Sequence, residues 1–304
     1  MVAIDAGTYS FTVTVAGCPS TPATTAVVVN PAPTISSTTA TPNPTCFNGN
    51  SQLQVSASLP TQPSGYSMTP SAGSFTPLVG ATTVAAVKAD DAVSGALPIG
   101  FTFNYAGSSY TTVRASSNGF LSFNASAGST ATNSLTAPGA TQLPLIAPFW
   151  DDLDGTSVGT ASYLTTGSAP NRVFTFEWLN WEWNWLANAA VISFQAKLFE
   201  ADGRIEFVYR QDAAAYNPGA TLGASIGLAG ATAGNFLSLD GTECQPASNS
   251  LETSTLSVKP ATGQVYSFAP PALGYAWSPA TFLSATNIAN PVATAVNALA
   301  RHIR

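Results

Sequence analysis

The sequence contains little charge and no cluster of basic residues. Only 8% of the 304 residues are charged, whereas an average soluble domain has about 25%. Because Lys and Glu usually cover helix surfaces, their scarcity disfavours helices. The nine Lys and Arg are spread singly along a chain with a formal net charge of −6. Without a basic patch we expect no nucleic-acid partner.

Long apolar runs are missing as well. No stretch of about 18 apolar residues occurs, so we expect no membrane insertion. The segment after Met1 has neither a basic region nor a long apolar core, so we expect no signal peptide in this sequence. A composition so poor in charge is unusual for a cytoplasmic protein, which is the alternative, and favours a secreted protein of the cell surface.

The residues of common catalytic and metal sites are scarce. His302 is the only histidine, and Cys18, Cys46 and Cys244 show no metal-ligand spacing. The sequence also has no nucleophile elbow, zinc-protease motif or phosphate-binding loop. We therefore expect no enzyme activity and no cofactor, calcium being the one alternative. Three cysteines allow at most one disulfide within the chain, and Cys244 is the candidate for the unpaired one.

Residues that favour strands and turns are abundant in their place, including 24 Gly and 22 Pro. Short strand-like segments recur every ~8 to 14 residues without helical periodicity, which predicts an all-β fold with a central antiparallel sandwich or jelly roll over 60–271. The strands expected there are 100–105, 110–115, 119–123, 144–149, 160–165, 172–179, 190–199, 204–209, 223–228 and 264–268.

The two ends have patterns of their own. Residues 8–15 alternate strictly, and residues 24–29 form a second strand-like stretch, which together predict a β-hairpin within 1–30. Four prolines among Ser and Thr predict an extended linker over 31–45. The remaining segments are short strands at 46–59 and 272–297 and a tail at 298–304. The hairpin residues expected to take part in assembly are Tyr9, Phe11, Val13, Val15, Val27 and Val29.

These end segments resemble the immunoglobulin-like and polycystic-kidney-disease-like repeats of large secreted surface proteins, or adhesins, of gliding bacteria. The hairpin contains Gly7-Thr8-Tyr9, a turn at Cys18 and Val27-Val28-Val29, as the last two strands of such repeats do. Cys46-Phe47-Asn48-Gly49-Asn50 resembles the opening of a repeat, and Tyr275-Ala276-Trp277-Ser278-Pro279 resembles its middle. The resemblance implies a small immunoglobulin-like sandwich and a disulfide between Cys18 and Cys46.

The central segment resembles a nidogen-like extracellular domain over about residues 95 to 230. Three motifs in order carry this resemblance: Ser117-Asn118-Gly119-Phe120-Leu121-Ser122-Phe123, Leu145-Ile146-Ala147-Pro148-Phe149-Trp150-Asp151-Asp152 and Phe194-Gln195-Ala196-Lys197-Leu198. The resemblance implies a role in adhesion or matrix assembly, and the family offers no catalytic residues to transfer.

The order of the pieces leads to a hypothesis about assembly. The opening and middle of one repeat flank the nidogen-like segment, but its closing strands are missing, and the only closing hairpin lies at the N-terminus. An incomplete sandwich can be completed by a donated hairpin. Residues 8–29 would complete the next copy, giving a head-to-tail fibre, or the same chain, giving a permuted domain. The alternative is a slice of a longer repeat array.

Two further groups of residues are candidate sites. Asp151, Asp152 and Asp154 follow a predicted buried strand and could bind Ca²⁺; the alternative is a strand-ending turn with acidic caps. Four of the six Trp lie within 174–185. A slip of the strand near Asn180 would group the last three, and if exposed they could bind glycans or a partner, as in a carbohydrate-binding module. The alternative is core packing of these residues, Trp181, Trp183 and Trp185.

Overall fold

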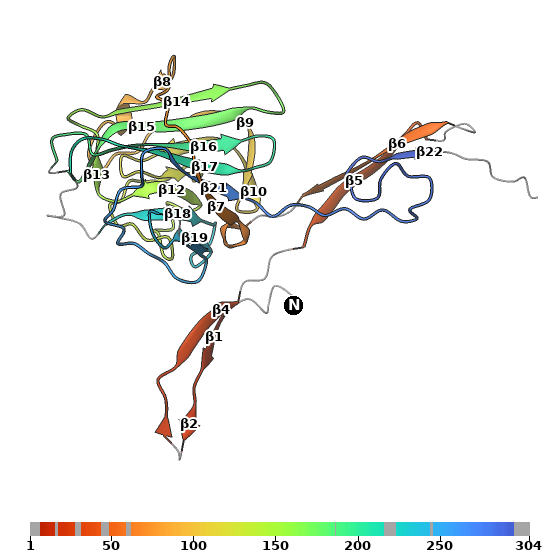
Figure 1. Ribbon diagram of the computed structural model, residues 1–304, viewed down its shortest axis with the longest axis horizontal. Coiled ribbons are helices and arrows are strands. Elements are labelled where there is room, and N and C mark those ends of the chain that lie inside the picture. Colours follow the sequence, from red (N-terminus) through yellow and green to blue (C-terminus); the bar gives the residue numbers. More distant parts are fainter. Residues whose placement is uncertain are drawn as a thin grey trace, which may run out of the picture. The chain divides into compact units, whose positions relative to one another are not determined.

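The computed structural model of the chain describes residues 7–15, 18–27, 32–43, 49–58, 62–185, 187–215, 223–243 and 246–294. The chain divides into two compact units (Figure 1). Unit 1 comprises Met1–Asn30 and Thr61–Pro270, and unit 2 comprises Pro31–Pro60 and Pro271–Arg304. Among the described residues, no helix has the length and apolar character that a membrane crossing requires.

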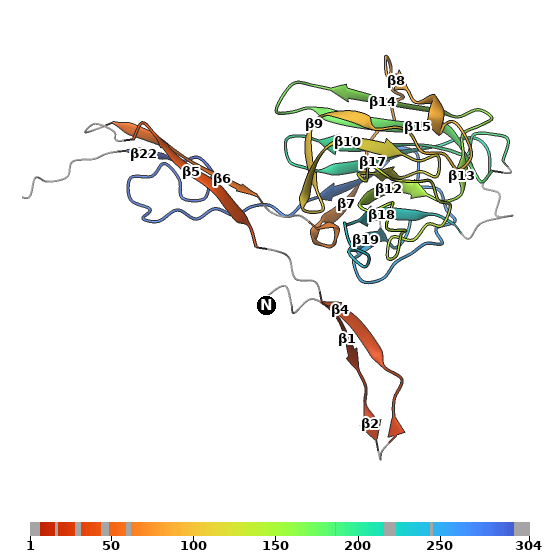
Figure 2. The same cartoon turned by 180° about the vertical axis from the view of Figure 1, so that it is seen from behind.

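The main part of unit 1 is a sandwich of two antiparallel sheets, seen as stacked layers in Figures 1 and 2. The first sheet has the order β20 (Ala247–Ser248), β19 (Phe236–Leu239), β18 (Ser225–Ala229), β12 (Leu145–Trp150), β11 (Leu121–Ser122), β10 (Ser108–Ala115) and β9 (Leu97–Tyr105). The second has the order β7 (Ser67–Ala72), β21 (Gln264–Ala269), β17 (Ile205–Gln211), β16 (Ile192–Phe199), β15 (Val173–Trp183), β14 (Thr160–Thr166) and β8 (Thr82–Thr83), with β13 (Leu153–Asp154) pairing with β15.

The predicted all-β class is confirmed, and a strand overlaps each of the ten predicted segments between 60 and 271. Helical structure in the described residues is limited to the short 3-10 turns η2 (Pro63–Gly65) and η3 (Ala85–Val87). The strands that the sequence did not predict there are β7, β8, β13, β19 and β20.

One hydrophobic core fills the space between the two sheets. Alternate residues of β9 are buried from Leu97 to Tyr105, as expected for a sandwich strand with one face in solvent. They join a cluster with aromatic residues of the opposite sheet, where Trp178 stacks on Phe194 with ring centroids 4.8 Å apart. Burial of these rings between two sheets supplies the main stabilisation of this fold.

Strand β12 is buried on both faces, because all six of its residues are buried. Ile146 and Phe149 belong to the core between the sheets, whereas Leu145 and Trp150 belong to a second cluster with Phe120. This explains why the motif from Leu145 to Trp150 is a continuous apolar run instead of an alternating one.

Unit 2 contains a three-stranded antiparallel sheet with the order β22 (Val292–Thr294), β6 (Asn50–Ser58) and β5 (Thr34–Thr41). Residues from both sides of the nidogen-like segment therefore pair in one sheet. The prediction of an unpaired linker over 31–45 is wrong for Thr34–Thr41, which pair with β6. The prolines flank this stretch, and the Thr and Ile residues within it favour a strand.

The N-terminal hairpin forms two short ladders. Strand β1 (Gly7–Phe11) pairs with β4 (Ala23–Val27), and β2 (Thr14–Val15) pairs with β3 (Cys18–Pro19). The predicted hairpin is thus present in the structure. Among the described residues, no strand outside the hairpin pairs with it.

Candidate functional site

The hairpin presents a row of apolar side chains to solvent. Tyr9, Phe11, Val13 and Val15 are 52%, 69%, 50% and 70% exposed. They occupy alternate positions of the first hairpin strand, as the sequence predicted. Exposed apolar rows of this kind usually mark sites of protein–protein contact. Of the other predicted assembly residues, Val29 and Cys46 and the side chains of Val27 and Cys18 lie outside the described residues, and so does the predicted disulfide.

The described residues of unit 2 form no buried hydrophobic cluster. Only Ser51 and Pro291 are buried among the described residues of 31–60 and 271–294. Leu53 and Val55 of β6 are only half-buried, and Ile35 of β5 is largely exposed. A three-stranded sheet is stable by itself only when it has a hydrophobic face or packs against another element, and the apolar side chains of this sheet are only partly covered.

One edge of this sheet is already covered. Beyond β22, the Ser284 amide donates to the Val292 carbonyl and the Thr294 amide donates to the Phe282 carbonyl, each at 2.9 Å. The opposite edge is β5, which pairs with β6 on one side only. Within the part of the chain that the structure describes, nothing pairs with its outer side.

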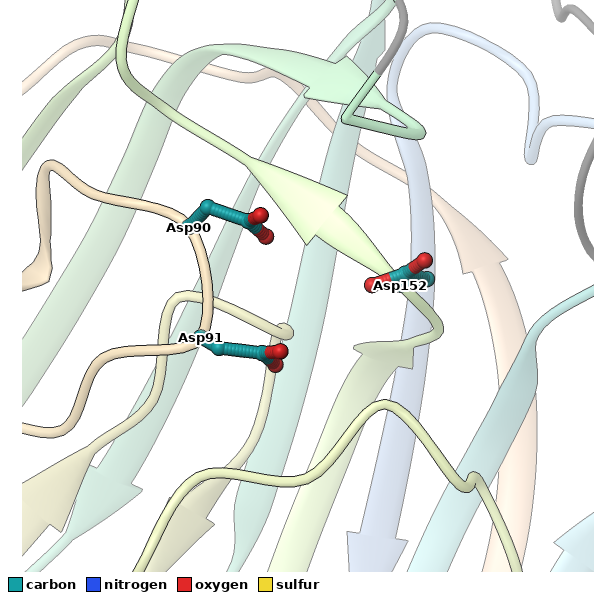
Figure 3. A group of neighbouring side chains, drawn as sticks. All are labelled: Asp90, Asp91 and Asp152. Atoms are coloured by element: carbon teal, nitrogen blue, oxygen red, sulfur yellow. The ribbon is translucent and has the colours of Figure 1, made fainter.

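A cluster of three carboxylates lies at the end of the sandwich in unit 1. Asp90 and Asp91 come from the loop after η3, and Asp152 comes from the link between β12 and β13; Figure 3 shows their side chains directed toward one another. One oxygen from each lies within 4.8 Å of the others. Such oxygens could supply part of the shell of about six to eight that Ca²⁺ prefers.

Burial and mutual repulsion both raise the pKa of carboxylates in this cluster. Burial is the largest cause of the raised pKa of Asp152, which is about 6, and the charges of the neighbouring carboxylates add to it. Burial and the charges of Asp91 and Asp154 also raise the pKa of Asp90. Asp91 is held by the Asn118 side-chain amide, which donates to it at 2.7 Å.

The structure thus groups Asp152 with Asp90 and Asp91, while a calcium site made of Asp151, Asp152 and Asp154 stays a prediction. Asp151 accepts a hydrogen bond of 2.6 Å from the Trp183 indole, and Asp154 accepts bonds from the amide and hydroxyl of Thr156. These two carboxylates therefore serve the local structure. Asp90 and Asp91 were missed because no sequence pattern relates their loop to the end of β12.

The tryptophan row is not a binding surface. Trp181 and Trp183 are completely buried, and only Trp185 is exposed, at 50%. The predicted slip is confirmed, because the pairing of β15 with β16 shifts between Trp178 and Trp181, and Asn180 has a φ of 57°. This extra residue keeps both Trp181 and Trp183 on the core side. The alternative of core packing is confirmed for these two residues, and the hypothesis of an exposed row is wrong.

A comparison with protein-family models identifies the main sandwich. The model described as NIDO related matches residues 65–270, which covers more than half of the chain. The chain belongs to the NIDO-related family. No curated protein and no solved structure matches it. The match agrees with the nidogen-like resemblance of the central motifs and indicates an extracellular domain of the structural or adhesive type.

Two buried glutamates stabilise the NIDO-related sandwich. Glu177 accepts hydrogen bonds from the Leu78 amide at 3.1 Å and the Gln195 side chain at 2.6 Å, while burial raises its pKa. Glu182 accepts from the amides of Ser157 and Val158 at 3.0 and 3.1 Å, and burial raises its pKa as well. Both carboxylates thereby fix loops of the NIDO-related domain to strand β15.

Proposed function

We propose that the protein is a non-enzymatic, secreted structural subunit of the adhesive type that assembles into an extracellular fibre. The hairpin of one copy completes unit 2 of the next copy by donating its strands. The observation that supports this most strongly is the sheet of unit 2, which pairs three strands although Pro291 is the only buried apolar residue among the described residues of this unit.

The two surfaces suit one another chemically. The hairpin exposes an apolar row, and unit 2 has apolar residues that are only half-covered. Residues 6–87 and 260–300 contain no Asp, Glu, Lys, Arg or His. Contact between these segments would therefore bury apolar surface. It would not incur the free-energy cost of removing a charge from water.

Head-to-tail assembly follows from the position of the two pieces in one chain. A contact that joins different surfaces of two copies, and does not close into a ring, produces a filament. Donation of strands to an incomplete sandwich is an established mode of extracellular assembly. A carbohydrate-binding module has no comparable support, because two of its three proposed aromatic residues are buried.

Negative-stain microscopy together with light scattering on a concentration series tests this proposal. We expect filaments and a mass that rises with concentration. The double change Phe11→Ser and Val13→Ser removes half of the exposed row and should lower the association constant at least about tenfold. Val79→Ser is the matched control, because Val79 is an exposed apolar residue of the NIDO-related sandwich. A wild-type chain that stays monomeric at every concentration would contradict the proposal.

A further inference from the structure

We infer that the docking site for the donated hairpin is the outer edge of β5, and that its occupant is the hairpin of a second copy of this chain. The inference rests on the proposed function and specifies the partner and the backbone groups that bind it. It depends on three features: the direction of the free amides, the absence of edge protection and the chemistry of the connection to the hairpin.

The direction of the β5 amides follows from the hydrogen bonds of β6. The amides of Leu53 and Val55 donate to carbonyls of Pro291 and Ala289, at 2.9 and 3.0 Å, on the β22 side. Since successive residues of a strand point to opposite sides, Gln54 points to β5, where its partner is Thr39.

The neighbours of Thr39 must then point the other way. Thr38 and Ala40 lie opposite Val55 and Leu53, and in an antiparallel ladder such pairs exchange no backbone hydrogen bonds. Their amides and carbonyls are directed to the outer side of β5. They form a ready donor and acceptor pattern for one more antiparallel strand.

Strand β5 also lacks the features that usually protect an edge. It is eight residues long, and its sequence from Thr34 to Thr41 contains neither a charged residue nor Pro. Short length, Lys, Pro and bulges are the common protective devices. The only one present is a register shift between Ile35 and Ser37, so the stretch from Ser37 to Thr41 is regular and open.

A hairpin added at this edge would also extend the apolar face of unit 2. Residues directly opposite in a ladder share a face, so Thr38 and Ala40 continue the face of Val55 and Leu53. The alternating row of the hairpin, headed by Phe11, would lie beside this face. Neither side contributes a charge, because residues 6–87 contain none.

The connection between hairpin and β5 favours a second copy over the same chain. Strand β4 ends at Val27 and β5 begins at Thr34, and the residues between include Pro31 and Pro33. Proline fixes its own φ and holds the residue before it extended. From its sequence we expect a segment with this alternation to be extended, which disfavours the tight reversal that pairing of β5 with its own β4 would need.

Sedimentation velocity on the full chain with substitutions at Thr38 tests the inference. Thr38→Pro removes one outward amide and leaves Thr39 and its bond to β6 in place. Thr38→Lys retains the amide but introduces a charge into an uncharged contact. Thr38→Val retains both the amide and β-branching and is the matched control. We expect the Pro and Lys variants to associate at least about tenfold more weakly than wild type, and the Val variant to associate normally.

The outcomes separate this inference from the proposed function. If the Pro and Lys variants assemble like wild type while the Phe11 and Val13 change abolishes assembly, the edge assignment is overturned and the fibre remains. If wild type itself is monomeric, the proposed function fails. If Pro and Val variants lose assembly equally, the side chain and not the amide matters, which also overturns the inference. The Lys variant covers the case in which Pro prevents unit 2 from folding.

Discussion

Trp178, Trp183 and Tyr209 are fully buried between the two sheets of the NIDO-related sandwich, whereas Pro291 is the only buried apolar residue among the described residues of unit 2. The sandwich thus contains its own core. The described strands of unit 2 form a single three-stranded sheet. The described strands of the hairpin pair only with each other and expose a row of apolar side chains. The difference separates a self-sufficient domain from pieces suited to assembly.

The sheet edges differ in the same way. In the NIDO-related sandwich, the edge strands β8 and β20 have two residues each, and the edge strands β7 and β9 contain Pro70 and Pro98. Each of these features discourages the addition of another strand. Strand β5 has eight residues and no internal Pro. The sheet edges of the complete sandwich are therefore protected against the addition of a strand. The β5 edge, where we propose that another copy binds, lacks these features.

The largest effect should come from truncating the core of the sandwich. Trp183→Ala removes a completely buried ring and its hydrogen bond to Asp151, and we expect a loss of about 3–5 kcal/mol in the free energy of unfolding. Urea denaturation followed by circular dichroism measures it. Trp185→Ala, at the exposed neighbour, should change stability by less than about 0.5 kcal/mol. Equal losses from both would contradict the assignment of Trp183 to the core.

Truncation in unit 2 should affect association more than folding. Leu53→Ala removes a half-buried side chain, so the unfolding of the sandwich should not change in dilute solution. In the assembled state the same side chain is expected to be covered, and the association constant should fall about tenfold. Sedimentation equilibrium provides this constant, with Val79→Ala as the control. An unchanged association constant would show that the face of β6 stays exposed.

The acidic cluster predicts a smaller, pH-dependent effect within the sandwich. The pKa of Asp152 is raised from 3.8 to about 6 in the folded chain. The folded state therefore binds a proton more tightly than the unfolded state, and stability falls as the pH rises through this window. Asp152→Asn should abolish the decrease in stability that ionisation of Asp152 causes. At pH 7 it should raise the free energy of unfolding by about 1 kcal/mol, allowing for solvent screening.

Urea denaturation between pH 4 and pH 7 checks this prediction. Asp202→Asn removes a carboxylate from an exposed turn, where the side chain is 57% exposed, and serves as the charge control. A pH dependence that Asp152→Asn leaves unchanged would show that the repulsion within the cluster is relieved in another way.

Strand positions and the slip at Asn180 were predictable from the sequence, because alternation and turn residues encode them locally. The exposure of the tryptophans was not, since a slip can move a side chain to either face and only the packing of the second sheet decides. The strand at Thr34–Thr41 was missed because the surrounding prolines dominated its interpretation. The meeting of Asp90 with Asp152 depends on a contact between segments far apart in the sequence, which no local pattern contains.

Amide hydrogen exchange at Thr38, Thr39 and Ala40, compared between dilute and concentrated samples, tests the central claim most directly. Thr39 is bonded to β6 in every state, so its exchange is the internal reference. If unit 2 is completed by another copy at the β5 edge, the Thr38 and Ala40 amides will become protected relative to Thr39 as assembly proceeds. If they exchange equally fast in monomers and in assembled material, the β5 edge is not where the copies join.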